Sequence, residues 1–496
     1  MKRYLPRQLD SKDTGSPLLA FAIIISVFSL VLMLPPVRTA LVSVTERIII
    51  RRPLRDVGKW DRLILCYAAV QLLVSVTAAW LFHRLETIKR GIEDFKKELE
   101  LSHVFLLLLV IAFIVQNGMQ VVHPDRTGWY MDSTNLWDHY VCVLGGKSPH
   151  LGMYPPFAAF IYRFYASIVP HELLSGDWKL LAYSDAGSYV TLLYYLFSVV
   201  PFCILCYASV EGKNWEKLLA TSACCLSAPF LYSLMRGNIV LFSCCAAFCF
   251  CRCVRSENGL VRLMGLFAIF IAIGTKLYPV AFAALLVKER RWKDIRLFLV
   301  LTLLLFITML NFFDGGVSEI AGMVRNISNF TSDFKGHHNL SLKRQIWDIL
   351  ALFGHAKDTG LFPVLNVMAY VLYLAASAVL FFVTKKRWVE LMLLSLACLL
   401  LPGIVRPYTE VFLVIPLIEM INDREKDLFL YFSLAFLLPM LLFICKVSVF
   451  ITFHSSLITF PLFALCAAEV IHERQFVLWH TEFQGSSFSR EKSGTE

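Results

Sequence analysis

Long apolar stretches constrain this chain more than any other feature of its sequence. A helix needs ~20 apolar residues to cross the hydrocarbon core of a bilayer, and several stretches reach or approach that length. The plainest are residues 16–34, 63–82, 103–116, 189–208, 297–310 and 428–445. They are continuous, whereas the strands of a membrane β-barrel alternate between apolar and polar residues. We therefore predict an all-α polytopic membrane protein with about 12–14 transmembrane helices.

The distribution of charge agrees with this prediction. Only 17% of the residues are charged, whereas a soluble domain has about a quarter. The net charge of +10 comes largely from basic residues in short loops between apolar stretches, such as 288–293 and 385–387. Loops of this kind mark the cytoplasmic side of a membrane, so we expect no nucleic-acid partner. The basic loop 38–62 is an exception that helix counting places outside, and the arrangement of the first two segments stays open.

Alternation from these loops puts both termini inside and leaves four polar stretches outside, which are residues 122–185, 236–238, 314–360 and 402–408. Residues 83–100 have apolar side chains on one helical face and charged pairs on the other, so we expect an interfacial helix on the inner membrane surface. The second large outer stretch has N-glycosylation sequons at Asn326, Asn329 and Asn339. They carry little weight, because chance supplies such tripeptides in a chain of this length.

Fourteen cysteines are present, and most of them lie inside the apolar stretches. Buried thiols behave as small apolar residues, so we interpret these cysteines as packing residues and not as a disulfide framework. Cys249, Cys251 and Cys253, at a spacing of two, would splay around a helix and cannot converge on one metal ion. The sequence predicts no metal site and no cofactor.

The first outer stretch contains two carboxylates and a histidine among aromatic residues, Asp132, Asp138 and His139. A carboxylate that is partly desolvated at a membrane boundary can act as a general base towards a hydroxyl group. The alternative is a solvated loop whose Pro-Pro turn begins an interfacial helix over residues 157–168. The residues alone do not decide between these two interpretations.

Three later breaks interrupt the apolar stretches and carry cations. Arg236 and Asn238 flank a glycine, and both offer donors suited to a phosphate or a sugar, although an ordinary loop would have the same sequence. Lys276 lies inside the apolar run 260–287, which is too long for one straight helix; Gly and Pro there predict a broken pair of helices. Its ammonium group needs an anion, either a carboxylate or a lipid phosphate. Arg406 lies in the last break, where snorkelling to lipid head groups is the alternative.

Carboxylates and cations at one membrane boundary suit an enzyme that acts on a lipid-phosphate substrate. The sequence has no Walker loop, no Rossmann glycine fingerprint, no zinc-protease motif and no hydrolase nucleophile elbow. The rival interpretation is a multi-pass transporter or flippase with broken helices around a central site. No repeated halves are present, and the polar breaks gather towards one face, which favours the enzyme. A structural subunit of an export complex would leave Lys276 and Asp132 without a shared role.

In their order along the chain these motifs resemble the C-type membrane glycosyltransferases, specifically glycosyltransferase family 87, which includes polyprenol-phosphate-mannose-dependent α-mannosyltransferases. The resemblance covers roughly residues 101–408. The motifs that carry it are Asp132, Gly145-Gly146 with Pro149, Tyr154-Pro155-Pro156, Gly237-Asn238 and Lys276-Leu277-Tyr278-Pro279. The chain departs from the family pattern at Leu136-Trp137, which replaces the usual aromatics, and at His150, where a tyrosine is common.

The resemblance implies that a sugar, with mannose the first expectation, is moved from a polyprenyl-phosphate donor to a glycan or glycolipid acceptor with inversion. It implies that Asp132 is the general base, with Asp138 as second choice, and that no metal is required. The phosphate of the donor would be held by Lys276, Arg236 and Arg406. The sugar or the acceptor would be held by Trp137, Tyr154, Asn238 and His139.

The same resemblance suggests the domain organisation and the location. We expect N-terminal helices and the amphipathic helix over residues 1–100, a C-type transmembrane catalytic domain over 101–471, and a cytoplasmic tail over 472–496. The outer loops 122–185 and 314–360 belong to the catalytic domain. A prokaryotic plasma membrane, with the active site facing outward among the membrane lipids, is the expected location.

Overall fold

The computed structural model describes residues 34–36, 136–225, 227–332, 339–352, 360–423, 459–460, 462–471 and 473. Within these ranges the protein is all-α and has no β-strand, as predicted. Several predictions lie outside the described residues. They concern most of the N-terminal region 1–100, the stretch 103–116, Asp132, the stretch 428–445 and the C-terminal tail.

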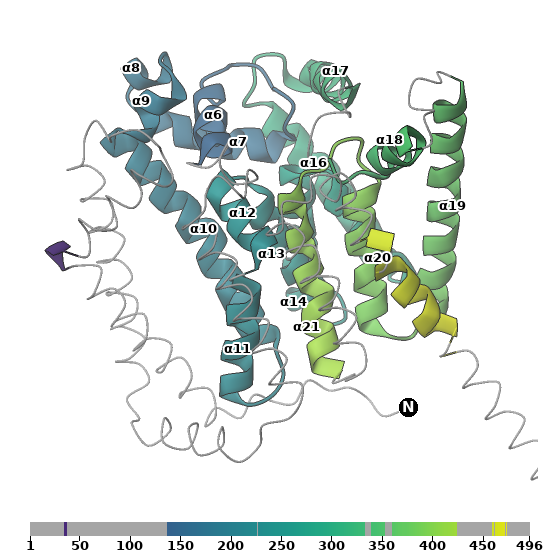
Figure 1. The fold of residues 1–496 in the computed structure, drawn as a ribbon. Helices are drawn as coiled ribbons and strands as arrows, with labels where there is room; N and C mark the ends of the chain where they lie inside the picture. Colours follow the sequence, from purple (N-terminus) through teal and green to yellow (C-terminus); the bar gives the residue numbers. More distant parts are fainter. Residues whose placement is uncertain are drawn as a thin grey trace, which may run out of the picture.

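Short helices form a layer across one end of a set of longer ones (Figure 1), and we call this the upper end. The layer comes from the two large polar stretches that the sequence places outside. From the first come α6 (Trp137–Gly145), α7 (Pro156–Ser167), α8 (His171–Leu174) and α9 (Trp178–Ala182). From the second come η4 (Gly316–Ser318), α17 (Glu319–Ser332) and α18 (Leu342–Leu352). The helix that the sequence allows at 157–168 is present as α7, and its interfacial position stays a prediction.

The remaining helices of the described residues lie between this layer and the opposite, lower end (Figure 1). They are α10 (Asp185–Ser209), α11 (Asn214–Cys225), α12 (Ala228–Arg236), α13 (Val240–Cys253), α14 (Gly259–Thr275), α15 (Ala284–Lys288), α16 (Trp292–Leu310), α19 (Leu361–Val383), α20 (Arg387–Leu400) and α21 (Val414–Asp423). Among the described residues, α10 and α19 are long and apolar enough to cross a membrane, and several others are shorter apolar helices. This pattern is that of an all-α membrane protein.

Local sequence signals set the ends of these helices. Ser184 Oγ accepts a hydrogen bond from Gly187 N at the start of α10, and Asn258 Oδ1 caps α14 by accepting from Leu260 N. Such side chains satisfy backbone N–H groups that have no partner within the helix. At the other end of α12, Gly237 adopts a φ of 67°, the left-handed conformation that commonly ends a helix.

Two of the apolar runs are divided by a break that is followed by a 3-10 helix. The run 260–287 forms α14, then η3 (Tyr278–Ala283), then α15, with Lys276 at the break as predicted. The run around 387–423 forms α20, then η5 (Pro407–Leu413), then α21, with Arg406 immediately before η5. The two 3-10 helices contact each other through Phe412, whose ring lies 5.7 Å from Tyr278 and 6.0 Å from Phe282.

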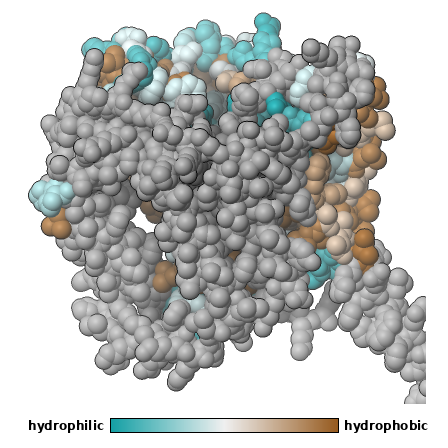
Figure 2. All heavy atoms as spheres, in the orientation of Figure 1, coloured by the Kyte–Doolittle hydropathy of each residue, from teal (hydrophilic) through white to brown (hydrophobic). Residues whose placement is uncertain are grey.

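The largest apolar core lies among the longer helices, with α13 in extensive contact with α14, and a second core lies under the upper layer. Helix α19 is different, because most of its apolar side chains are exposed. Figure 2 shows hydrophobic surface along the side of the molecule where α19 lies and mainly hydrophilic residues along the upper end. The cysteines of the described helices are free thiols, several of them buried in the main core.

Candidate active site

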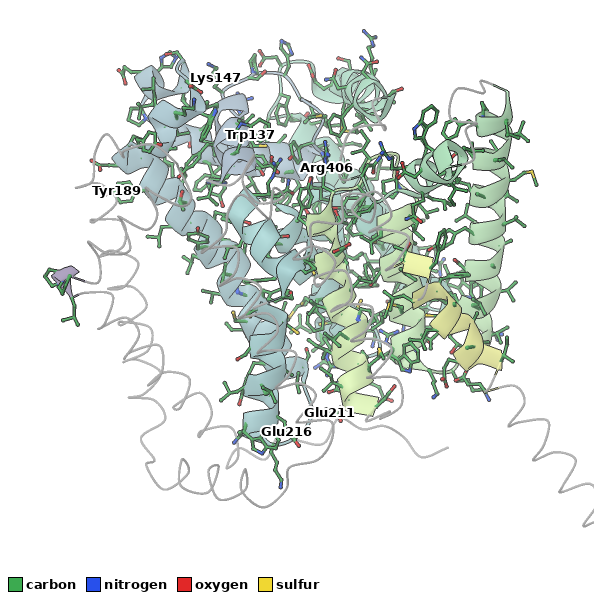
Figure 3. The ribbon with its side chains drawn as sticks, viewed as in Figure 1. Trp137, Lys147, Tyr189, Glu211, Glu216 and Arg406 are labelled. Carbon is green, nitrogen blue, oxygen red and sulfur yellow. The ribbon has the colours of Figure 1, made fainter. Side chains whose placement is uncertain are left out.

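Three breaks between helices meet the upper layer from below. The turn after α12 contacts α6, the end of α14 contacts α7, and η5 packs along α12. These breaks carry Arg236, Lys276 and Arg406, so cations from distant parts of the sequence reach one end of the molecule. Figure 3 shows Arg406 at this end with Trp137 and Lys147, whereas Glu211 and Glu216 lie at the lower end.

Glycines in the motifs permit these close approaches. A Cβ added to Gly237 would lie 2.6 Å from His139 Cβ, so the turn after α12 touches the first turn of α6. A Cβ on Gly274 would lie 2.8 Å from Phe157 Cβ, where α14 meets α7. Within the upper layer, a Cβ on Gly146 would lie 2.3 Å from the carbonyl oxygen of Tyr162. No other residue type fits at these three contacts without movement of a neighbour.

Asp138 is the centre of the resulting polar cluster. It lies in the first turn of α6, and only 7% of the residue is exposed. Arg236 binds it with two hydrogen bonds, from Nη2 to Oδ1 at 2.5 Å and from Nε to Oδ2 at 3.1 Å. Asn238 Nδ2 donates a third to Oδ2 at 2.8 Å. Both carboxylate oxygens are therefore engaged by protein donors, in the two-pronged geometry that arginine favours.

Aromatic faces cover the two cations nearest to Asp138. The guanidinium carbon of Arg236 lies 5.2 Å from the ring centroid of Trp137, which is 39% exposed. Lys276 Nζ lies 4.6 Å from the ring centroid of Tyr154, and its charge interacts with that of Asp138. Cations bind to aromatic rings in this way through the negative face of the ring. Burial raises the pKa of the Tyr154 phenol well above its usual value, so Tyr154 is a neutral donor here.

Arg406 is connected to the cluster by hydrogen bonds of residues next to it in the sequence. It is half-buried and precedes η5, where Ser233 of α12 donates to the Tyr408 carbonyl oxygen at 3.1 Å. Tyr194 of α10 in turn donates to the carbonyl oxygens of Ser233 and Asn238, at 3.3 and 3.1 Å. These bonds fix the turn after α12 and the start of η5 against each other, so Arg236 and Arg406 belong to one rigid group of elements.

His139 has a different environment from the predicted one. Its ring is fully buried among tyrosine rings, with centroids 5.2 Å from Tyr194 and 5.5 Å from Tyr165, and its Nε2 lies 3.1 Å from the Val190 carbonyl oxygen. Burial lowers the pKa of His139 to about 4, so the ring is neutral. The predicted contact of His139 with a sugar or acceptor is not supported, because no part of the ring is accessible. Its position indicates that it attaches α6 to α10.

The first-choice base, Asp132, lies outside the described residues and precedes Trp137 by a few positions in the sequence. The second choice, Asp138, is less suited to act as a base in this structure, because Arg236 and Asn238 already engage both of its oxygens with three hydrogen bonds. The remaining predicted residues lie at the upper end, and their roles stay predictions. They are Trp137, Tyr154, Arg236, Asn238, Lys276 and Arg406.

Sequence reasoning missed two residues of this site, Cys142 and Tyr162. The ring of Tyr162 lies 5.5 Å from Tyr154, and Cys142 lies close enough to Asp138 and Lys276 to sense both charges. The sequence signal for them is weak. Cys142 follows Asp138 by one helical turn and Tyr162 lies on α7, but residues that only pack in an apolar core have the same spacing. His150 bonds Glu319 Oε1 of α17 at 2.8 Å and so joins the segment between α6 and α7 to α17.

Chemically, this cluster offers a site for an anion beside a site for a sugar. Arginine and lysine bind phosphate oxygens, and partly buried cations act more strongly on developing negative charge than cations in water do. The exposed tryptophan ring suits the apolar face of a sugar ring. Asn238 donates a hydrogen bond to Asp138 through Nδ2 and accepts one from Val240 N through Oδ1. Because it is also buried, it supports the cluster and does not face a substrate.

Comparison with known proteins gives one match. The sequence profile of glycosyltransferase family 87 matches residues 153–406, about half of the chain. The matched region begins just before Tyr154 and ends at Arg406, and it includes the breaks at Arg236-Gly237-Asn238 and Lys276. It does not include Asp132 or Asp138. No curated protein and no solved structure matches the chain.

Proposed function

The chain belongs to glycosyltransferase family 87, and from this premise we propose that it uses a polyprenyl-phosphate sugar as donor. The sugar, with mannose as the first candidate, is transferred to a glycan or glycolipid acceptor at the outer face of the membrane. A glycosyltransferase needs a donor and an acceptor site that meet at one point. The upper end of the molecule is the place where both can be accommodated.

One observation carries the proposal. Arg236, Lys276 and Arg406 come from three breaks in apolar helices and reach the upper end, where Arg236 binds the buried carboxylate of Asp138 and the charge of Lys276 interacts with it. A charge inside an apolar region is expensive, so three cations at one level indicate an anionic ligand. Arginine and lysine side chains in such positions suit a phosphate group at the bilayer boundary.

The reaction then needs one base and one leaving group. Asp132 takes the proton from the acceptor hydroxyl while that oxygen attacks the anomeric carbon of the donor sugar. The bond from the anomeric carbon to the phosphate oxygen breaks, and polyprenyl phosphate leaves with the electron pair. Attack opposite to the leaving group inverts the anomeric configuration. Lys276 and Arg406 stabilise the additional charge on the leaving phosphate.

Asp138 has a positioning role in this scheme and not the role of a second base. Its paired hydrogen bonds hold the Arg236 guanidinium against the Trp137 ring, and its bond with Asn238 fixes the turn after α12. Trp137 presents its other face to the sugar or acceptor. The neutral Tyr154 covers Lys276 and offers its ring on the same side of the cluster.

The test is sugar transfer from radiolabelled polyprenyl-phosphate mannose in membranes that contain the wild-type protein, Asp132→Asn or Asp138→Asn. We expect Asp132→Asn to abolish transfer without loss of folded protein, because the base is gone. Asp138→Asn should lower transfer and stability together, because it leaves Arg236 without its counter-charge. Lys276→Gln should raise the KM for the donor and lower kcat.

The alternative outcomes separate the parts of the proposal. Equal transfer by wild type and Asp132→Asn would remove Asp132 from the chemistry. No transfer by wild type, with either mannose or arabinofuranose donors, would contradict the polyprenyl-phosphate donor. In that case a transport assay with the same labelled lipid in vesicles tests the carrier interpretation.

A further inference from the structure

The segment Asn339–Ser341 has an unusual set of contacts with the break that carries Arg406. Asn339 Oδ1 accepts hydrogen bonds from Val405 N at 2.8 Å and from Ser341 N at 3.1 Å. Asn339 Nδ2 donates to the Gly403 carbonyl oxygen at 3.2 Å. The Asn339 side chain therefore binds both the backbone of its own segment and the backbone of residues 403–405, which immediately precede Arg406.

Two further bonds complete the attachment. Ser341 Oγ donates to the same Gly403 oxygen at 3.0 Å, and Leu340 N donates to the Val405 oxygen at 2.7 Å. Asn339, Leu340 and Ser341 are buried, with 6%, 2% and 0% of each residue exposed. Hydrogen bonds of buried groups are costly to break, because the groups left behind have no water to bind. The loop 403–405 thus has one well-defined conformation.

Asn339 is the asparagine of a sequon, but its environment contradicts a role as a glycan acceptor. Its amide nitrogen is buried and donates to Gly403, whereas a glycosylated asparagine must present that nitrogen to solvent. Asn326, the first sequon asparagine, is exposed on α17. The two asparagines share a sequence signature and differ completely in surroundings, which makes Asn326 a matched control.

We propose that Asn339, assisted by Ser341, is a positioning residue that fixes the loop 403–405 and so holds Arg406 at the leaving phosphate. This inference rests on the proposed function of Arg406. The second outer loop thereby contributes to the donor site without touching the donor. Displacement of a catalytic group by about 1 Å can reduce turnover ~100-fold, so the effect of losing this attachment should be measurable.

The experiment is a double-mutant cycle with Asn339→Ala and Arg406→Gln in the donor-transfer assay. Arg406→Gln should reduce kcat/KM for the donor by about 100-fold or more, as the loss of an anion-stabilising group does. Asn339→Ala should reduce kcat/KM for the donor about 10-fold and leave the KM for the acceptor unchanged. The double variant should be no worse than Arg406→Gln alone, because Asn339 acts through Arg406.

Asn326→Ala should match the wild type in transfer, and Ser341→Ala should show a smaller loss of the same kind as Asn339→Ala. Losses that multiply in the double variant would overturn the positioning role and leave the proposed function intact. A wild-type rate in Arg406→Gln would overturn the phosphate role of Arg406 and the inference with it. The thermal unfolding midpoint of each variant is measured as well, so that the rates are compared only between folded proteins.

Discussion

At the scale of single residues, Asp138, Arg236 and Lys276 each have a specific partner. Asp138 pairs with Arg236, Arg236 lies on Trp137, and Lys276 lies on Tyr154. Such pairing offsets the cost of bringing charges out of water, and it also fixes the direction of each side chain. Trp137 is 39% exposed, so its ring is accessible to solvent.

The role of Trp137 leads to the first prediction. We expect Trp137→Ala to raise the KM for the sugar-bearing substrates about 10-fold, since stacking contacts of aromatic rings contribute roughly 1 kcal/mol or more. Trp137→Phe should retain part of the affinity, because a ring remains over Arg236. Steady-state kinetics with both variants measure the effect, and equal KM values for all three proteins would contradict it.

His139 leads to a prediction about pH. Its folded-state pKa is about 4, below the usual 6.5, because of burial. Between those values the unfolded chain binds a proton that the folded protein does not, so stability is lost as the pH falls through this range. At pH 5 the loss amounts to about 2 kcal/mol.

His139→Gln keeps a donor for the Val190 carbonyl oxygen and cannot be protonated. We therefore expect its thermal unfolding midpoint to fall less than that of the wild type between pH 7 and pH 5. The same decrease in both proteins would show that His139 is not the residue responsible.

At the scale of helices, the site depends on close contact between the upper layer and the breaks beneath it. Gly237 lies at such a contact, and Gly146 lies at a contact within the upper layer itself, between α6 and α7. The neighbouring Gly145 provides a control, since a Cβ there meets nothing within 4 Å. Adjacent glycines of one motif therefore have different functions.

We expect Gly146→Ala to destabilise the protein by roughly 1–3 kcal/mol, because the new methyl group meets the α7 backbone at Tyr162 and cannot be accommodated by a rotamer change. Gly145→Ala should be neutral or slightly stabilising, because alanine favours the helical state. Thermal unfolding in detergent compares the two. Similar midpoints for both variants would contradict the close contact between α6 and α7.

At the scale of the whole molecule, an ionic cluster at the lower end anchors the broken helices. Glu390 of α20, 1% exposed in its side chain, binds Arg387, Lys288 and Arg255 at 2.8, 2.9 and 3.1 Å. These cations come from the start of α20, the end of α15 and the loop after α13. The cluster thus fixes the lower ends of the elements whose upper ends form the site, and Glu289 adds one more contact with Arg255.

We expect Glu390→Gln to destabilise the protein by about 3–5 kcal/mol, because three cations lose a buried counter-charge. Glu289→Gln should cost less, about 1 kcal/mol, since Glu289 is 25% exposed and binds one partner. The rate of transfer per folded molecule should remain unchanged in both variants, since the cluster lies at the end opposite to the site. Unfolding midpoints and specific activity measure these effects separately.

The sequence by itself determined the helical class and the breaks at Arg236-Gly237-Asn238, Lys276 and Arg406. It also allowed a helix over residues 157–168, which the structure has as α7. The physical reason is that these features are local. An apolar run demands a helix in lipid, and a charge, glycine or proline within that run ends it.

Only the tertiary structure decided which partner each polar residue has. Asp138 and Asn339 look in the sequence like a base and a glycan acceptor, whereas the fold pairs Asp138 with Arg236 and places Asn339 against Gly403 and Val405. His139 resembles a substrate ligand and is buried beside Val190. These partners are distant in the sequence, so they are chosen by the packing of helices and not by local pattern.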